Sequence, residues 1–134
     1  GAGLMSEMLW NPLLVFLGGG LGAVSRYLVT TFIGNQVGGN FPFGTFTANI
    51  IGSFLMGFAM FCFLNRGMAV PEHIRLLLLV GFLGGFTTFS SFSMETVSLI
   101  QNQHILSSIM NVAGNVCLGI GAVLAGMLAA NTLS

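Results

Sequence analysis

Charge is what this 134-residue sequence has least of, since it contains no lysine and no aspartate and only 4% of its residues are charged. An average soluble domain has about 25% charged residues, so this chain cannot build a water-soluble surface. Its three basic residues are also too few to neutralise a run of nucleic-acid phosphates. The composition therefore excludes a soluble enzyme with a polar catalytic cleft, and it excludes a nucleic-acid-binding protein.

The chain also lacks paired cysteines and any visible catalytic constellation. Cys62 and Cys117 both fall inside apolar stretches, without the spacing of a disulfide framework or a zinc site. We interpret both as reduced, small hydrophobic residues. The sequence shows no nucleophile and base pair, phosphate-binding loop or cluster of metal ligands, so we do not expect an enzyme.

Apolar residues make up 54% of the chain. They form four stretches bounded by polar or turn-forming residues: 13–33, about 44–64, 74 to about 100, and 105 to about 130. At about 1.5 Å per residue, each stretch can cross a hydrocarbon core about 30 Å thick as a helix. Helices are expected because backbone groups in lipid must be satisfied within the segment. The sequence predicts an all-α membrane protein in which residues 1–134 form a single domain of four transmembrane helices.

The third stretch changes character halfway along. Residues 84–95 read Gly-Gly-Phe-Thr-Thr-Phe-Ser-Ser-Phe-Ser-Met-Glu, two glycines followed by hydroxyl and phenylalanine side chains. Such a run is a poor continuous helix, and its hydroxyls can replace backbone partners that a break removes. We therefore predict that helix three is interrupted near Gly84-Thr88. Interrupted helices at membrane depth line cavities or ion sites; a serine-rich packing face is the alternative.

Polar residues inside the other stretches are functional candidates, because they are costly in lipid. The second stretch contains Asn49, and the fourth contains Asn111 and Asn115, which lie four residues apart and share a helix face. The first stretch contains Arg26, which we interpret as a structural anchor that pairs with Glu95 or caps nearby carbonyls. A cation pump would concentrate carboxylates in its spans, and this chain does not.

These groups predict a path for a small anion. Amides and hydroxyls, among them Ser90 and Ser93, present hydrogens, and the edge of a phenyl ring is the positive end of its quadrupole. Phe89 and Phe92 lie three residues apart on one helix face within the hydroxyl-rich segment. Core packing would explain any single phenylalanine, so the hypothesis depends on their place in this segment. Glu95, one turn further, is either an interfacial carboxylate or part of a vestibule.

Four motifs follow one another along the first three stretches. They are Gly-Gly-Gly-Leu-Gly-Ala at 18–23 with Arg26 and Tyr27, Phe-Pro-Phe-Gly-Thr at 41–45, Asn-Ile-Ile-Gly-Ser-Phe at 49–54, and the segment 84–95. Together they closely resemble the motifs of the Fluc fluoride channels, also called the CrcB family. The resemblance implies a passive, fluoride-selective channel in the bacterial inner membrane, which exports fluoride from the cytoplasm and so prevents its toxicity. It also implies an antiparallel, dual-topology homodimer with two pores and a sodium ion at the dimer centre.

Carried over by position, the resemblance implies a role for each residue of the ion path. Asn49 would be the pore asparagine, Phe89 and Phe92 the two box phenylalanines, and Glu95 the vestibule glutamate. The remaining residues that we assign to the path are Ser90, Ser93, Asn111 and Asn115. The fourth stretch matches less well than the others, because the family often has Tyr and Ser where this chain has its two asparagines.

The resemblance also implies the structural positions around the dimer centre. Gly84 and Thr87 would offer backbone carbonyls to the sodium ion, and Arg26 would be the arginine of helix one. No carboxylate lies close enough in the sequence to suit a divalent ion there.

The few charges outside the spans give weak orientation signals. Topology follows Lys and Arg in short loops, and the arginines on the loop side are Arg66 and Arg75, around one connection. Such a chain can insert in both orientations, as an antiparallel homodimer requires. The segment ahead of the first stretch carries Glu7 and no basic residue, so we expect a permanent first span and not a signal peptide.

Two other function classes compete with the channel. A small four-span multidrug/proton antiporter needs a carboxylate embedded in its first span, and this chain has only Arg26 there. A four-span scaffold or assembly subunit would need only the glycine-rich faces, but it would leave the asparagines and hydroxyls unexplained. The residues favour the channel over both.

Overall fold

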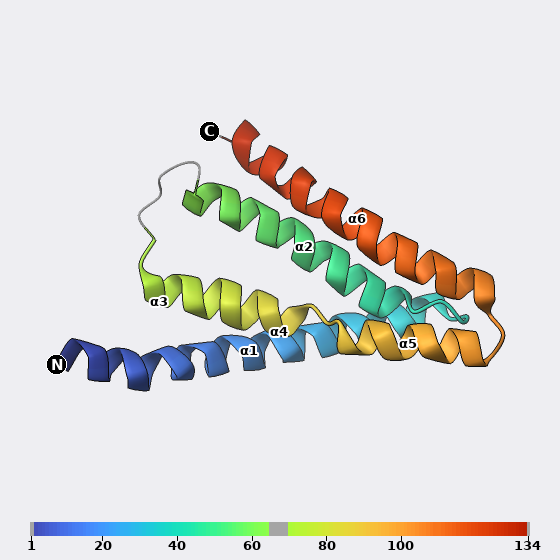
Figure 1. The fold of residues 1–134 in the computed structure, drawn as a ribbon, viewed down its shortest axis with the longest axis horizontal. Helices are drawn as coiled ribbons and strands as arrows, with labels where there is room; N and C mark the ends of the chain where they lie inside the picture. Colours follow the sequence, from blue (N-terminus) through green and yellow to red (C-terminus); the bar gives the residue numbers. More distant parts are fainter. Residues whose placement is uncertain (1, 65–69, 134) are drawn as a thin grey trace.

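The computed structural model describes residues 2–64 and 70–133, and every regular element in them is a helix. The long helices are α1 (Ala2–Val37), α2 (Phe43–Leu64) and α6 (Ile105–Thr132) (Figure 1). Between α2 and α6 come four shorter elements: α3 (Glu72–Arg75), the π-helix η1 (Leu76–Leu83), α4 (Gly84–Phe86) and α5 (Ser90–Gln101). The connection 65–69, which includes Arg66, lies outside the described residues.

Four segments of the described chain are helical, long and apolar enough to cross a membrane. They are Gly3–Val37, Phe43–Leu64, Glu72–Gln101 and Ile105–Thr132. The third of them contains α3, η1, α4 and α5. The predicted all-α membrane protein with four transmembrane helices is therefore confirmed.

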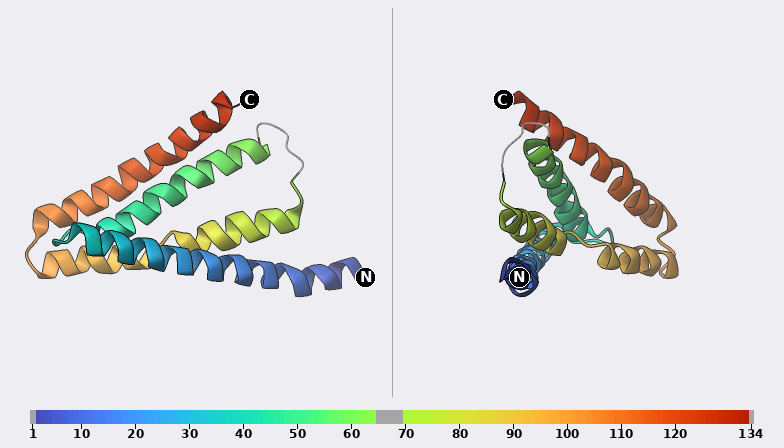
Figure 2. Two further views of the ribbon diagram at one scale, coloured as in Figure 1. Left: turned by 180° about the vertical axis from the view of Figure 1, so that it is seen from behind. Right: turned by 60° about the vertical axis from the view of Figure 1, so that its left-hand side comes forward.

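Helix α1 is longer than the sequence predicted, because it begins at Ala2 and runs through Pro12. A proline inside a helix removes one backbone donor and crowds the carbonyl four residues earlier, but the residues ahead of Pro12 include Leu4 and Met8, which are good helix formers. The N-terminal part of α1 projects beyond the other helices (Figures 1 and 2). At its other end, Gly38 and Gly39 have φ angles of 53° and 91°, the left-handed conformation that ends helices.

The helices pack as two pairs, α1 against η1 and α4, and α2 against α6 (Figure 2). Glycines set the distance within each pair. A Cβ atom built at Gly22 would fall on the carbonyl of Phe82, and one built at Gly126 would fall on the carbonyl of Phe54. In lipid no hydrophobic effect drives helices together, so close backbone contact at small residues supplies the packing energy.

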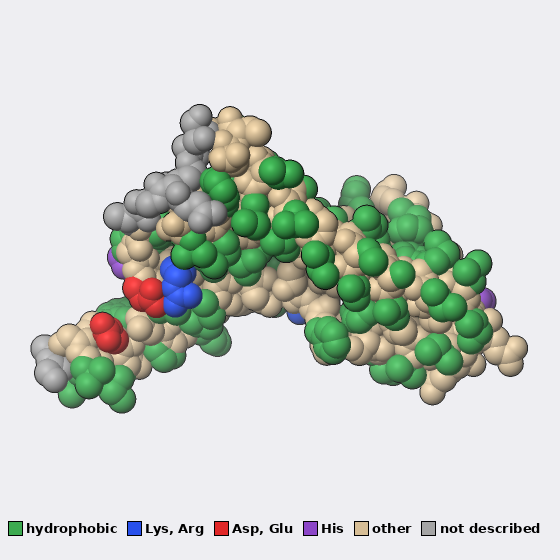
Figure 3. Space-filling model, turned by 45° about the horizontal axis from the view of Figure 1, so that its top comes forward, with side chains coloured by type: hydrophobic (Ala, Val, Ile, Leu, Met, Phe, Trp, Pro, Cys, Tyr) green, Lys and Arg blue, Asp and Glu red, His purple; other side chains and the backbone are tan. Residues whose placement is uncertain are grey.

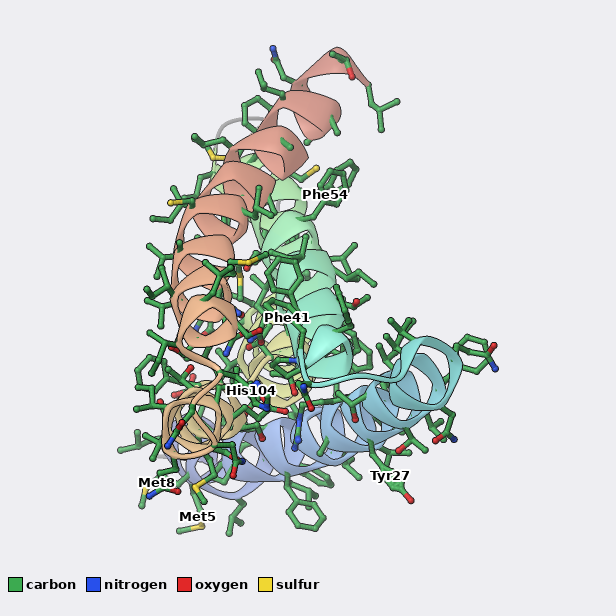
Figure 4. All side chains as sticks on the ribbon, turned by 90° about the vertical axis from the view of Figure 1, so that its right-hand side faces the viewer. Met5, Met8, Tyr27, Phe41, Phe54 and His104 are labelled. Carbon is green, nitrogen blue, oxygen red and sulfur yellow. The ribbon has the colours of Figure 1, made fainter. Side chains whose placement is uncertain are left out.

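The outer surface of the chain is apolar. Large hydrophobic side chains are exposed along all four spans, and Figure 3 shows them over most of one face, with acidic side chains only at one end. Met5, Met8 and Tyr27 of α1 point away from the other helices (Figure 4). Such a surface suits contact with lipid or with another apolar protein surface.

We expect Gly126→Ala to loosen the contact between α2 and α6. The added methyl would overlap the backbone of α2, and overpacking of this kind costs about 1–3 kcal/mol. The midpoint of thermal unfolding of the purified protein in detergent should fall. Gly121→Ala is the matched control on the same helix, because a Cβ there meets nothing within 4 Å. Equal unfolding midpoints for the two variants would contradict the close packing.

Candidate functional site

The third span is broken between α4 and α5. Thr87 leaves the helix with φ −87° and ψ 158°, and regular helix resumes at Ser90. Both the N–H and the hydroxyl of Thr87 donate to the carbonyl of Leu83, each at 3.1 Å, which closes the last turn of α4. The interruption predicted near Gly84-Thr88 is confirmed. The π-helix ahead of it was not predicted, because the apolar run of η1 carries no sign of a wider turn.

Asn49 of α2 holds the break through two hydrogen bonds with one residue. The N–H of Thr88 donates to Asn49 Oδ1 at 2.9 Å, and Asn49 Nδ2 donates to the carbonyl of Thr88 at 3.1 Å. The carboxamide therefore satisfies both backbone groups of Thr88, the residue at the break. An unpaired backbone group in an apolar environment costs several kcal/mol. That cost is a large fraction of the net free energy of unfolding of a small domain.

The break also frees two backbone carbonyls. In an α-helix the carbonyls of Gly84 and Thr87 would accept from the N–H groups of Thr88 and Ser91. Here the Thr88 N–H donates to Asn49, and the Ser91 N–H donates to Thr88 Oγ1 at 3.2 Å. Both carbonyls are thus left without their α-helical donors. Carbonyl oxygens of this kind are ligands for a hard cation.

Arg26 of α1 caps a neighbouring carbonyl. Its Nε donates to the carbonyl of Gly85 at 3.1 Å, between the two freed oxygens in sequence. Of the two structural roles expected for this arginine, the structure shows capping, and among the described residues it forms no ion pair with Glu95. The charge thus anchors α1 to the end of α4.

The asparagines predicted in spans two and four form one chain of hydrogen bonds. Asn49 Nδ2 donates to Asn115 Oδ1 at 3.0 Å. Asn115 Nδ2 donates to the carbonyl and to the Oδ1 of Asn111, at 2.8 and 3.0 Å. Asn111 Nδ2 donates to Thr96 Oγ1 at 3.0 Å, and that hydroxyl donates to the carbonyl of Phe92 at 2.8 Å. This chain of hydrogen bonds links α2, α6 and α5 across the bundle.

A cavity of about 360 Å³ lies beside this chain. Its lining comes from α2, α6, the break and α5, and includes Asn49, Ser53, Thr87, Thr88, Phe89, Phe92 and Asn115. The rings of Phe89 and Phe92 have centroids 5.7 Å apart and are tilted by 53°. Phe89 is 78% exposed, so its ring has room for a partner on its other side. The structure therefore brings four predicted path residues to one cavity.

The other predicted path residues lie outside this cavity. Asn111 is 1% exposed and buried behind Asn115. Ser93 of α5 is half-buried, and Ser90 is exposed with its hydroxyl 3.4 Å from that of Thr88. Neither serine lines the cavity.

Glu95 lies in a second, smaller cavity of about 160 Å³. The lining comes from the end of α1, the start of α2 and the loop between them, including Thr30, Phe41 and Thr45. Glu95 Oε2 accepts a hydrogen bond from Thr45 Oγ1 at 3.0 Å, while its buried Oε1 has no partner. The carboxylate thus stands apart from the asparagine chain, at the end of the bundle that holds the loop between α1 and α2.

Several polar residues at the site were not predicted from the sequence as members of it. Thr88 and Thr96 are bound to asparagines, and Thr45 is bound to Glu95. Thr88 was visible within the hydroxyl-rich segment, but nothing local distinguished it from its neighbours. The partners lie between 15 and 50 residues apart in the sequence, so only the packing of the helices identifies them.

Comparison with known proteins gives consistent matches over most of the chain. The family model described as CrcB-like protein, Camphor Resistance (CrcB), matches residues 13–127. A protein of Hahella chejuensis (strain KCTC 2396) named Fluoride-specific ion channel FluC is 45% identical over 118 residues, which covers 87% of this chain and 92% of that protein.

Two further relatives carry the same name. The one from Caulobacter vibrioides (strain NA1000 / CB15N) is 46% identical over 118 residues, covering 88% of this chain and 93% of the relative. The one from Shewanella woodyi (strain ATCC 51908 / MS32) is 48% identical over 116 residues, covering 87% and 92%.

We expect Arg26→Gln to destabilise the fold. The substitution removes a charged donor from the Gly85 carbonyl, and hydrogen bonds to charged groups contribute about 1.5–3 kcal/mol. The midpoint of chemical unfolding in detergent should fall. Arg75→Gln is the matched control, because Arg75 pairs with Glu72 at an exposed position and such pairs contribute little. If both variants unfold at the wild-type midpoint, Arg26 does not anchor the break.

Proposed function

The chain belongs to the CrcB family, and from this membership we infer that it is a fluoride-specific ion channel and not an enzyme. In the structure, the cavity at the break of the third span supports this inference most directly. Asparagine, hydroxyl and phenylalanine side chains line it, and none of its lining residues in the described chain is titratable.

The chemistry of this lining suits a small anion that passes without coupling to protons. Fluoride must exchange its hydration shell for groups that present positive charge, and carboxamide hydrogens and phenyl ring edges do so without a fixed charge. Conduction requires binding that is favourable enough for entry and weak enough for release, which neutral donors provide. A multidrug/proton antiporter needs a titratable carboxylate in its path, and the lining described above offers none.

We assign the ion path to Asn49, Asn115, Phe89 and Phe92 at this cavity, with Glu95 at a vestibule formed by the second cavity. Ser90, Ser93 and Asn111 would support the path from neighbouring positions. The supporting observations are the shared lining and the hydrogen-bond chain through the asparagines.

The functional unit that we propose is an antiparallel, dual-topology homodimer. The exposed ring of Phe89 and the apolar outer face of α1 offer surfaces for a second copy. In this dimer the carbonyls of Gly84 and Thr87 from each copy would hold a structural sodium ion. Their loss of α-helical donors fits this role. The ion would join the two breaks at the dimer axis.

The four apolar spans make the chain a multi-pass membrane protein. We propose the bacterial inner membrane as its location. Fluoride that enters a cell as the neutral acid ionises inside, and a passive channel in that membrane would release the anion down its gradient.

The proposed function predicts selective, uncoupled fluoride efflux. Liposomes that contain the purified protein, are loaded with the potassium salts of fluoride and chloride, and carry a potassium ionophore to balance the charge should release fluoride alone, with no need of ATP or a proton gradient. Fluoride-selective and chloride-selective electrodes measure the two ions in parallel, and protein-free liposomes give the background leak. Equal release of both ions, or none from folded protein, would refute the assignment.

The aromatic part of the path is tested by Phe89→Ile and Phe92→Ile. Isoleucine keeps much of the apolar volume and removes the ring edge, so fluoride flux per folded dimer should fall about three- to ten-fold in at least one variant. Phe54→Ile is the matched control, because Phe54 of α2 is not among the residues that line the cavity. Wild-type flux in both path variants would mean that the rings only pack.

A further inference from the structure

The orientation of the Asn49 carboxamide is fixed by the backbone of Thr88. The Thr88 N–H can only donate, so it faces Oδ1, and the Thr88 carbonyl can only accept, so it faces Nδ2. Of the two hydrogens on Nδ2, one therefore goes to the Thr88 carbonyl. The other goes to Asn115 Oδ1 at 3.0 Å.

The orientation of Asn115 is fixed in the same way. Its Nδ2 lies 2.8 Å from the backbone carbonyl of Asn111, which can only accept, so Oδ1 must be the atom that faces Asn49. Further along, the Thr96 hydroxyl gives its hydrogen to the Phe92 carbonyl and therefore accepts from Asn111. All hydrogens in this series of bonds point away from Asn49. Backbone groups set the orientations of Asn49 and Asn115 directly, and the Phe92 carbonyl sets that of Asn111 through the Thr96 hydroxyl.

The carboxamide hydrogens of Asn49 and Asn115 are therefore all engaged within the protein, and none is free for an anion at the cavity. The bond from Asn49 to the Thr88 carbonyl is part of the pair that holds the helix break, so giving it up would disturb the fold. The bond to Asn115 joins two side chains that both line the cavity. The Asn49 hydrogen in this bond is therefore the one that can change its acceptor from Asn115 to an ion without disturbing the break.

We propose that Asn115 is a specificity-determining residue that competes with the anion for Asn49. Between ions, Asn115 Oδ1 accepts the Nδ2 hydrogen that fluoride needs, and fluoride binds by taking that hydrogen from it. The competition weakens binding and so favours release. The inference rests on the proposed function and on the direction of the hydrogen bonds described above.

The variant that tests this is Asn115→Leu, which is close in size to asparagine and has no acceptor. One hydrogen of Asn49 would then have no competing acceptor in the protein. The fluoride concentration that gives half-maximal efflux should fall about five-fold, which is the change in affinity that corresponds to the net free energy of one neutral hydrogen bond. If Asn115 instead donated to the ion or served packing alone, that concentration would rise or stay unchanged, and either result overturns the proposal. Asn102→Leu, at an exposed position after α5, is the matched control for reconstitution.

A measurement on the unmodified protein covers the case in which Asn115→Leu does not fold. Fluoride is titrated into protein with ¹⁵N-labelled asparagine while the side-chain amide signals are followed by NMR. The signals of Asn49 and Asn115 should move together with one midpoint, and chloride should move neither. Movement of the Asn49 signals alone, or of neither residue in protein that conducts fluoride, overturns the proposal. Absence of fluoride efflux from the wild-type protein would instead refute the proposed function.

Discussion

The two hydrogen bonds between Asn49 and Thr88 are the interaction on which the site depends. They satisfy both backbone groups of a residue that lies outside any helix, and so they make a break in the third span tolerable in lipid. The same bonds withdraw the Thr88 N–H from Gly84 and leave that carbonyl without its α-helical donor. One carboxamide thus sets the cavity, the free carbonyl oxygen and the start of the asparagine chain.

This arrangement requires rigid helices on both sides of the break. Glycines that allow carbonyl-to-backbone contact lock α2 against α6 and α1 against η1, while Arg26 fastens α1 to the end of α4. Because the helices cannot slide without backbone overlap, Asn49 and Asn115 keep the separation that one hydrogen bond needs. Small residues at the contacts between helices therefore fix the geometry of the polar side chains in the cavity.

Most of the fold could be predicted from the sequence, and only part of the site. Apolar runs of sufficient length predicted the four spans, and the two glycines followed by hydroxyl residues predicted the break, because both signals are local. The pairing of Asn49 with Thr88 spans 39 residues, and no local pattern encodes it. The sequence also predicted asparagine donors along the path. It could not predict that these donors bind one another, because that depends on the distance between α2 and α6.

A chain of neutral hydrogen bonds has a physical advantage for a channel that must bind and release its ion quickly. A fixed positive charge at the cavity would hold fluoride strongly, and an empty cavity lined with unpaired donors would be costly in lipid. Donors that hydrogen-bond to groups within the protein avoid both problems. Without an ion, their hydrogen bonds are already made. When an ion binds, the gain in free energy is only the difference between its hydrogen bond and the one that it replaces. Glu95 fits the same logic, because the carboxylate lines a separate cavity from Asn49 and Asn115.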